Sequence, residues 1–553
     1  MTVTDETAPG PQVLVVGAGP VGLSAAHELA RHGARVRLVD AAHGPATTSR
    51  ALATHARTLE TYDQMGVLDD LLPRGRRVEH FTLHQNGRCL IRFDTDYSRL
   101  PTRFPFTLMV DQAVTEEVLR TAAARHGVTV EWGVRLVDFE DLGTGGVRAR
   151  LRHPDGRAET VTADWLVGCD GGHSTVRKQL GLKLTGESSE TWLIADAHVD
   201  CDLPQDSIHW MRTPAGTVMM VPFPEPGKWR LLDTAETSYG GDDAMVARRF
   251  AAKIATGTGR PARVEEPTWV SVFTIQQRMI STMRQGRVLL AGDAAHVHSP
   301  ASGQGMNTGV QDAVNLAWKL AAVLRGEAAD ALLDTYSEER VPVGAELLRT
   351  TRMATMLVQL RSRRAAAGLR AAFTVLRTLR PLKSRIQRKI MGGMSALGLS
   401  YAEGPLAYAA GPGVADGALR PGERVGRVDG ADHAADAGWQ QLTDELRRPG
   451  WSLLTFGGLP ADTERDARDI AGRYGDSVRV RTVGGAPVDG AEPLADPEGR
   501  LAAGLGVAPG GWLLVRPDGY LAARGASPAG PAAALTALGL RPAAKATEEA
   551  GAR

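Results

Sequence analysis

The chain has 553 residues, and its 64 basic residues almost balance its 63 acidic ones, leaving a formal net charge of +1. This length exceeds one ordinary hydrophobic core, so we expect two or three domains. The balanced charge gives no electrostatic reason to expect nucleic acid as a partner. Residues 1–10 are polar and lead into an apolar strand, and no apolar run is long enough to span a membrane. We therefore expect a cytoplasmic protein that does not bind membranes.

The three cysteines, Cys89, Cys169 and Cys201, lie far apart and form no C-x-x-C pair. Their number and spacing fit a reducing compartment and argue against a disulfide framework. No further cluster of ligand residues accompanies them, so we expect no metal site.

The first chemical motif follows the apolar, β-branched residues 13–16, which are typical of a strand. It is Gly17-Ala18-Gly19-Pro20-Val21-Gly22, and residues 23–32 then have the pattern of a helix. Residues 35–39 predict a second strand, which Asp40 ends. This arrangement indicates a Rossmann-type dinucleotide site, although a tight turn without a ligand would also contain these glycines.

Each part of this motif has a physical task. The first glycine permits a tight turn, the second lets the backbone approach a pyrophosphate, and the third lets helix and strand pack closely. Asp40, eighteen residues after Gly22, is placed to accept a hydrogen bond from a ribose hydroxyl. The motif does not distinguish FAD from NAD(P). No second such motif follows a strand, which argues against separate FAD and NADPH domains.

A second half of the site is predicted at residues 286–307. The apolar residues 288–291 predict a strand that leads into Gly292-Asp293. The glycine-rich turn Gly303-Gln304-Gly305-Met306-Asn307 then opens a helix with apolar residues at helical spacing up to residue 324. A helix N-terminus carries partial positive charge and unpaired N–H groups. Together with the first motif, this arrangement predicts a flavin site.

The remaining segments suggest further units. Residues 76–108 and 187–282 contain short alternating runs split by Gly and Pro, which predict sheets, whereas residues 110–180 have an α/β pattern. Residues 347–402 contain many basic residues and no acidic one. Such a segment fits a membrane surface or an anionic partner, but packed helices with solvated basic faces are the interpretation we favour.

The C-terminal part begins after a Gly/Pro-rich linker at residues 403–425. Residues 426–542 have the element order β-α-β-α-β-β-α, which resembles a thioredoxin-like fold. Because no cysteine follows Cys201, this domain cannot perform dithiol chemistry. We expect it to serve packing or contact in a homodimer.

Three motifs in order resemble the class A FAD-dependent aromatic hydroxylases, the group of p-hydroxybenzoate and phenol hydroxylases. They are residues 17–22, residues 170–177 (DGGHSTVR, matching D-G-x-x-S-x-V-R) and residues 292–296 (GDAAH). The polyketide and rifamycin-type hydroxylases with a thioredoxin-like C-terminal domain are the most similar members. The resemblance implies an α/β fold in which a Rossmann-type FAD-binding domain (10–75, 106–186, 283–402) holds an inserted antiparallel-sheet substrate domain (76–105, 187–282).

The resemblance also assigns residues to FAD. The glycine motif with Asp40 and Ala41 would hold the ADP half, and Asp40 replaces the more usual Glu. Arg50 would lie near the pyrophosphate, unless it is an ordinary surface arginine. Gln112 and Asp293 would contact the ribityl chain. Backbone N–H groups of three further residues would face the flavin pyrimidine oxygen, namely Gly305, Met306 and Asn307.

Other assignments concern catalysis. Pro300 would lie beside the C4a face of the flavin. Asp170 would contact both FAD and NAD(P)H, although Asp170 and Arg177 could instead be a structural ion pair and cap. We interpret His296 as structural and leave the role of His298 open. Candidate substrate residues, which could equally be core residues, are Trp210, Met220, Phe223 and Trp229.

The activity implied is NAD(P)H- and O2-dependent hydroxylation of a fused-ring aromatic polyketide through a flavin C4a-hydroperoxide. Baeyer–Villiger oxygen insertion, or hydroxylation of another phenolic substrate, would use the same motifs. A flavin-binding scaffold without turnover and an FAD-dependent reductase are alternatives from other functional classes.

Overall fold

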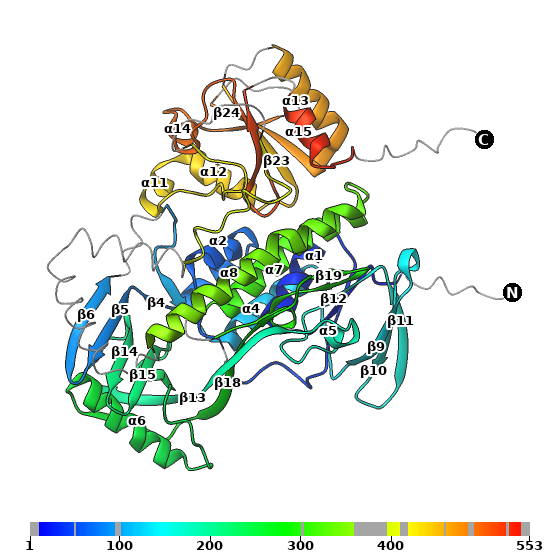
Figure 1. Ribbon diagram of the computed structural model, residues 1–553. Helices are drawn as coiled ribbons and strands as arrows, with labels where there is room; N and C mark the ends of the chain where they lie inside the picture. The colour runs from blue at the N-terminus through cyan, green and yellow to red at the C-terminus, as the bar shows by residue number, and fades with distance from the viewer. Residues whose placement is uncertain are drawn as a thin grey trace.

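The computed structural model describes residues 10–48, 51–94, 101–299, 303–358, 395–409, 418–457, 461–484, 491–526 and 530–542. Most of the basic segment, part of the linker, and the site candidates Arg50 and Pro300 lie outside these residues. Within the described residues, no helix is long and apolar enough to cross a membrane. Figure 1 shows two α/β units, with the N-terminal one carrying a large additional sheet.

A six-stranded sheet of order β19-β20-β12-β1-β2-β8 is the centre of the nucleotide-binding part. β1 is fully buried and pairs in parallel with β12 and β2, so the carboxyl ends of these three strands lie at one edge. Helices α1, α4 and α7 pack beside this sheet. The strands are β1 Val13–Val16, β2 Val36–Asp40, β8 Val130–Trp132, β12 Trp165–Gly168, β19 Arg284–Gln285 and β20 Val288–Leu290; the helices are α1 Pro20–Arg31, α4 Gln112–Arg125 and α7 Gly305–Leu324.

A nine-stranded, mostly antiparallel sheet adjoins this part. Its order is β21-β18-β13-β16-β15-β14-β5-β6, with β17 paired to β13. Helix α6 (Asp243–Thr258) covers one face and buries Val246, Phe250 and Ile254 against it. The strands are β5 His80–Gln85, β6 Arg88–Asp94, β13 Thr185–Cys201, β14 Ser207–Thr213, β15 Gly216–Pro222, β16 Lys228–Asp233, β17 Ala262–Val264, β18 Trp269–Met279 and β21 His296–Val297.

Smaller elements complete the N-terminal unit. One three-stranded sheet has the order β11-β10-β9 and another the order β3-β7-β4. Their strands are β3 Ala53–Thr54, β4 Arg76–Val78, β7 Thr107–Met109, β9 Arg135–Asp141, β10 Val147–Arg152 and β11 Ala158–Ala163. The helices are α2 Ala56–Gln64, α3 Leu68–Leu71, α5 Thr175–Gln179 and α8 Asp334–Val358.

The C-terminal unit has a six-stranded sheet of order β22-β27-β26-β23-β24-β25. β23 is parallel to β24 and antiparallel to β26, and β26 is antiparallel to β27. The strands are β22 Tyr408–Ala409, β23 Trp451–Phe456, β24 Val478–Val483, β25 Glu492–Leu494, β26 Trp512–Val515 and β27 Leu521–Gly525; the helices are α11 Gly430–Ala435, α12 Ala437–Leu446, α13 Ala461–Tyr474, α14 Arg500–Leu505 and α15 Gly530–Ala537.

A buried network of charged side chains joins the C-terminal unit to α7 and α8 of the N-terminal unit. Arg516, in the β26–β27 hairpin, binds Glu339 of α8 at 2.6 and 2.9 Å and Asp518 at 2.6 Å. Lys319 of α7 donates to the same Glu339 at 2.8 Å, and Trp318 donates to Asp518 at 3.1 Å. Helix α7, whose first residues belong to the predicted site, is therefore held by the C-terminal unit.

Candidate functional site

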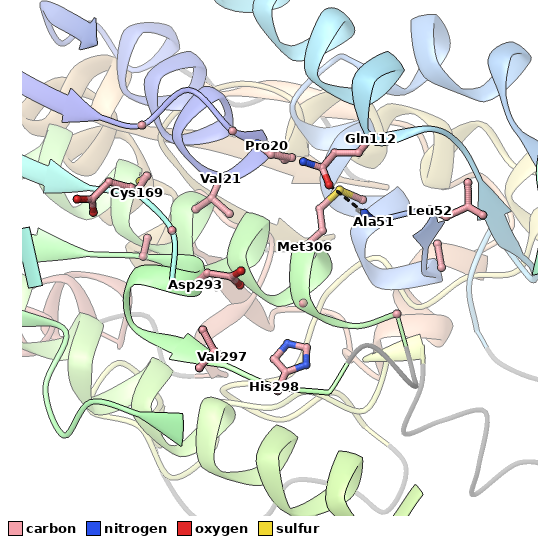
Figure 2. Close-up of a pocket in the computed structure, with 18 of the residues that line it drawn as sticks. Pro20, Val21, Ala51, Leu52, Gln112, Cys169, Asp293, Val297, His298 and Met306 are labelled. Atoms are coloured by element: carbon pink, nitrogen blue, oxygen red, sulfur yellow. Dashed lines mark hydrogen bonds between the residues drawn. The ribbon is translucent and has the colours of Figure 1, made fainter. Parts of the chain in front are cut away.

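A cavity of about 660 Å³ extends from the β1–α1 turn to the nine-stranded sheet. Figure 2 shows side chains around it from the first and third sequence motifs, Val21 and Asp293, together with Cys169, which directly precedes the second motif. Most of the predicted cofactor residues line this cavity, namely Gly17, Gly19, Pro20, Val21, Asp40, Ala41, Gln112, Asp170, Asp293, Gly305 and Met306. The structure thus brings together residues that are up to almost 300 positions apart.

The three motif glycines have different surroundings. Gly17 has a φ of +103°, and a Cβ added there would lie 2.4 Å from the carbonyl oxygen of Cys169. A Cβ on Gly22 would lie 1.8 Å from the carbonyl oxygen of Gly17, so helix and turn can approach only without a side chain. A Cβ on Gly19 would meet no protein atom within 4 Å, although Gly19 lines the cavity. Open space at Gly19 is what a backbone that approaches a ligand requires.

Asp40 lies at the end of β2 beside this turn. Its carboxylate accepts hydrogen bonds from the backbone N–H groups of Ala18 at 2.6 Å and Ala42 at 2.7 Å. These bonds fix the carboxylate at the cavity wall, where each of its oxygens retains further acceptor capacity. Ala18 itself and Gly22 support the turn and do not line the cavity.

The second motif ties the turn after β12 to the third motif. Asp170 accepts from the Ser174 hydroxyl at 2.5 Å and from the Thr175 and Val176 N–H groups at 2.6 and 3.1 Å, which holds the start of α5. Arg177 donates to the carbonyl oxygens of Gly172 at 2.8 Å and Ala294 at 3.1 Å. Asp170 thus does serve as a cap, but the described side-chain bonds of Arg177 go to carbonyl groups.

Asp312 of α7 holds the third motif in place. It accepts from the Gly292 N–H at 3.1 Å, bonds His296 Nε2 at 2.7 Å, and pairs with Arg340 at 2.6 Å. Burial alone would raise the pKa of Asp312, but Arg340 and then His296 outweigh it and lower that pKa. His296 is 2% exposed within this network, which agrees with a structural role.

His298 lies on the cavity wall beneath the first turn of α7 (Figure 2). Its Nδ1 lies 3.1 Å from the Ser299 carbonyl oxygen, which can only accept, so Nδ1 carries the hydrogen. Burial, and next the neighbouring His296, lower the pKa of His298. Both effects favour the neutral imidazole form of His298.

The N-terminus of α7 faces the cavity, and its N-cap residue Gln304 makes no side-chain cap hydrogen bond in the described part of the chain. Gly305 and Met306 line the cavity, which leaves helix-terminal N–H groups available to a ligand. The Asn307 side chain points elsewhere: it accepts from the His55 N–H at 2.8 Å and donates to the Ala53 carbonyl at 2.9 Å. Gln112, across the cavity, accepts from the Ala51 N–H at 2.9 Å.

The nine-stranded sheet supplies the far wall of the cavity. Of the four candidate substrate residues, Trp210 lines it. Met220 and Trp229 lie on the opposite face, packed against Phe250 of α6, so their assignment to the pocket was wrong. Successive strand residues point to opposite faces, and Met219 rather than Met220 faces the cavity. Phe223 belongs to the core on the cavity side of the sheet but does not line the cavity.

Residues 11–351 match the family described as "FAD binding domain", which covers more than half of the chain. The chain is also 55% identical over 518 residues to the 6-methylpretetramide 4-monooxygenase of Streptomyces rimosus, covering 94% of this chain and 91% of that protein. The chain belongs to the FAD-dependent aromatic monooxygenases.

Solved structures agree with this assignment. The monooxygenase superposes with the OxyS anhydrotetracycline hydroxylase from Streptomyces rimosus at a TM-score of 0.72 and 30% identity, covering 97% of this chain and all of that one. It also matches the flavin-dependent monooxygenase PieE, whose structure is a complex with FAD and substrate. That match has a TM-score of 0.76 and 25% identity over 96% of this chain and 99% of PieE.

The residues of this monooxygenase fit FAD, the cofactor of its family. The open backbone at Gly19 suits a pyrophosphate, and Asp40 offers acceptors to a ribose. The α7 terminus, which lines the cavity at Gly305 and Met306, suits a flavin carbonyl oxygen. Two further segments that no sequence motif indicated also line the cavity: Ala51–Ala53 with His55, and Val134–Leu136. Pairing between β3 and β7 brings the first of these segments to the site, a long-range contact without a local sequence signal.

Substitution of one tryptophan on each face of the sheet distinguishes the face that lines the cavity from the face that packs against α6. We expect Trp210→Ala to raise the KM for the aromatic substrate by about tenfold, the effect of losing one aromatic contact. Trp229→Ala should leave KM unchanged and lower the stability by about 3–5 kcal/mol, because its indole is 1% exposed. Steady-state kinetics and denaturant unfolding of both variants measure this contrast, and equal KM values for the two would contradict it.

Proposed function

We propose that this monooxygenase uses FAD, NAD(P)H and O2 to hydroxylate a fused-ring aromatic polyketide. One observation carries the proposal: a single cavity runs from the glycine turn to a broad apolar sheet wall. That wall contains Phe81, Ile194, Ile208, Trp210, Met219, Val221 and Leu232. The similarity to the 6-methylpretetramide 4-monooxygenase supports a substrate of this class.

In this proposal, the two ends of the cavity have different tasks. Gly17, Gly19 and Asp40 would hold the ADP half of FAD, and Gln112 and Asp293 would contact its ribityl chain. Helix-terminal N–H groups at Gly305 and Met306 would favour negative charge on the flavin pyrimidine. Arg50 at the pyrophosphate and Pro300 at the flavin face remain predictions, because they lie outside the described residues.

The chemistry that FAD supplies when bound is oxidation of NAD(P)H, followed by activation of oxygen and its transfer to the substrate. The chain's own residues orient the aromatic ring and exclude water from it. Trp210 and Met219 offer flat and adaptable apolar contacts, and the buried sheet behind them keeps the wall dry. Because oxygen transfer belongs to the cofactor, we propose no side-chain nucleophile.

We further propose the domain limits given by the sequence, with 10–75, 106–186 and 283–402 as the FAD-binding domain and 76–105 and 187–282 as the substrate domain. We also propose that residues 426–542 form a thioredoxin-like domain without redox activity. Its element order β23-α13-β24-β25-α14-β26-β27-α15 supports this interpretation, with β25 as one strand more than the sequence pattern predicted. We propose that the role of this domain is structural, namely to hold α7 and α8 in place.

The function is tested with purified, FAD-loaded protein, NADPH and 6-methylpretetramide, compared with no substrate and with a monocyclic phenol. We expect the fused-ring compound to stimulate NADPH oxidation and to yield a product with one added oxygen atom. NMR of that product distinguishes a new ring hydroxyl from the ester of a Baeyer–Villiger insertion. Stimulation that yields only hydrogen peroxide would refute the substrate class.

A further inference from the structure

The indole N–H group of Trp210 is a buried hydrogen-bond donor on the cavity wall of the large sheet. Trp210 belongs to β14, lines the cavity and is 8% exposed. Its Nε1 atom is buried and has no hydrogen-bond partner in the described part of the chain. A buried N–H group without an acceptor costs free energy, whereas a phenyl ring would fill similar space without that cost. Because Trp210 also lines the cavity, a molecule bound there can supply the acceptor.

Neighbouring side chains hold this indole in place. Trp210 stands opposite Leu83 of β5 and Met219 of β15 in the sheet register. The centre of the Phe81 ring lies 5.7 Å from that of the indole, and the two rings are inclined at 45°. All four side chains belong to one apolar cluster on the cavity side of the sheet. This packing restrains the indole, so its N–H group offers a donor in a defined position.

The surroundings of Trp210 make this donor valuable to a bound molecule. Aromatic polyketides commonly carry ketone or quinone oxygens on their rings. Burial of such an oxygen against apolar groups is unfavourable unless the oxygen accepts a hydrogen bond. The indole N–H group can satisfy this oxygen, whereas the other apolar side chains of this wall cannot, namely Phe81, Ile194, Ile208, Met219, Val221 and Leu232.

We propose that the Trp210 indole donates a hydrogen bond to a neutral carbonyl oxygen of the substrate, and so favours substrates that carry a ketone or quinone at that position. This inference rests on the proposed function. No proton is transferred and no covalent bond changes, so the contribution of Trp210 is to orientation and specificity. An analogue with a methylene group in place of the carbonyl loses this hydrogen bond and binds less tightly.

A second tryptophan of the same cluster provides the matched control. Trp192 of β13 is 1% exposed, and its Nε1 atom also lacks a hydrogen-bond partner among the described residues. Unlike Trp210, Trp192 does not line the cavity, so its N–H group is not offered to a bound molecule. The test variant is Trp210→Phe and the control variant is Trp192→Phe. Each substitution keeps an aromatic ring and removes one buried indole N–H group.

The probes are 9-fluorenone and fluorene, two tricyclic compounds of similar shape. Fluorenone has a ketone where fluorene has a methylene group, and neither ionises near neutral pH. Difference spectra of the FAD-loaded protein measure both dissociation constants, and their ratio gives the preference for the ketone. We expect Trp210→Phe to reduce this preference by about three- to tenfold relative to the wild type, the effect of losing one hydrogen bond. Trp192→Phe should leave it unchanged.

Infrared difference spectra with carbon-13-labelled fluorenone test the hydrogen bond itself. A carbonyl that accepts a hydrogen bond has a lower C=O stretching frequency than the same carbonyl in an apolar solvent. We expect this lowered frequency in the wild type and in Trp192→Phe, and a return towards the apolar value in Trp210→Phe. A merely structural role of the indole would not move this band. The wild-type spectrum is informative even if a variant fails to fold.

An apolar C=O frequency in the wild type would overturn the inference. So would the same frequency and the same preference in Trp210→Phe and the wild type, or equal weakening of both probes in Trp210→Phe, which would indicate packing alone. An equal loss of preference in Trp192→Phe would overturn it too. If the binding results hold but no fused-ring product forms, the proposed function fails and the carbonyl site remains. If product forms but the binding results fail, the function stands without this site.

Discussion

Replacing Gly19 with alanine should leave the protein folded and deprive it of FAD. Gly19 has an ordinary φ of −72°, and an added Cβ meets no protein atom within 4 Å. The methyl group would instead occupy the space where the pyrophosphate must approach the backbone. We expect the dissociation constant of FAD to rise by about 10- to 100-fold, equivalent to about 1–3 kcal/mol of overpacking. Flavin fluorescence titration of the apoprotein measures it.

Gly22→Ala is the informative contrast, because its Cβ would lie 1.8 Å from a backbone oxygen of Gly17. The turn or the helix must then move, so the apoprotein itself should lose stability by about 1–3 kcal/mol or more. Denaturant unfolding of both apoproteins separates the two effects. A Gly19→Ala protein that binds FAD with wild-type affinity would show that the cofactor does not lie on this turn.

Arg516→Ala should strongly lower the stability of the protein and should also weaken the flavin site from a distance. Arg516 is fully buried and neutralises Glu339 and Asp518. Burial alone would raise the pKa of Glu339, but Arg516 and then Lys319 hold it well below its usual value. Removal of the guanidinium group leaves carboxylates buried without enough positive charge. We expect a loss of about 3–5 kcal/mol.

FAD retention should fall in the same variant, because Glu339 also holds Lys319 and Asn315 of α7. FAD release on heating, followed by flavin fluorescence beside unfolding by circular dichroism, measures both effects. The matched control is Arg349→Ala, which breaks an arginine–glutamate pair whose side chains are 65% and 57% exposed. Such exposed pairs contribute at most about 1 kcal/mol. Equal losses in the two variants would contradict a structural role for the interface network.

The first motif shows how far a sequence with strong local signals can be interpreted. Residues 13–16, the glycine turn and Asp40 lie where the pattern predicted them. The helix begins at Pro20 rather than at residue 23, since proline suits the first helical position. Helix α6 was not predicted, although Asp242 caps it and Val246, Phe250 and Ile254 repeat at helical spacing. Strand patterns precede and follow this segment, so residues 187–282 were interpreted as sheet.

Two other features could not be derived from local patterns. Met219 and Met220 are adjacent and alike, so only the sheet's position against α6 and the cavity decides which one faces a ligand. Helix α7 has an apolar stripe, which suggests a solvent-exposed opposite face carrying Asp312 and Lys319. The structure buries both residues completely, because α8 and the C-terminal unit cover that face. The burial of Asp312 and Lys319 beside their charged partners depends on tertiary contacts alone.

The most direct test of oxygen transfer to a fused-ring aromatic substrate is product analysis after turnover under oxygen-18 gas. The reaction would contain FAD-loaded protein, NADPH and 6-methylpretetramide, and mass spectrometry would follow the product. Our account predicts that the product carries one oxygen-18 atom as a new ring hydroxyl, formed in step with NADPH consumption. A product without oxygen-18, or NADPH consumption with unchanged substrate, would contradict it.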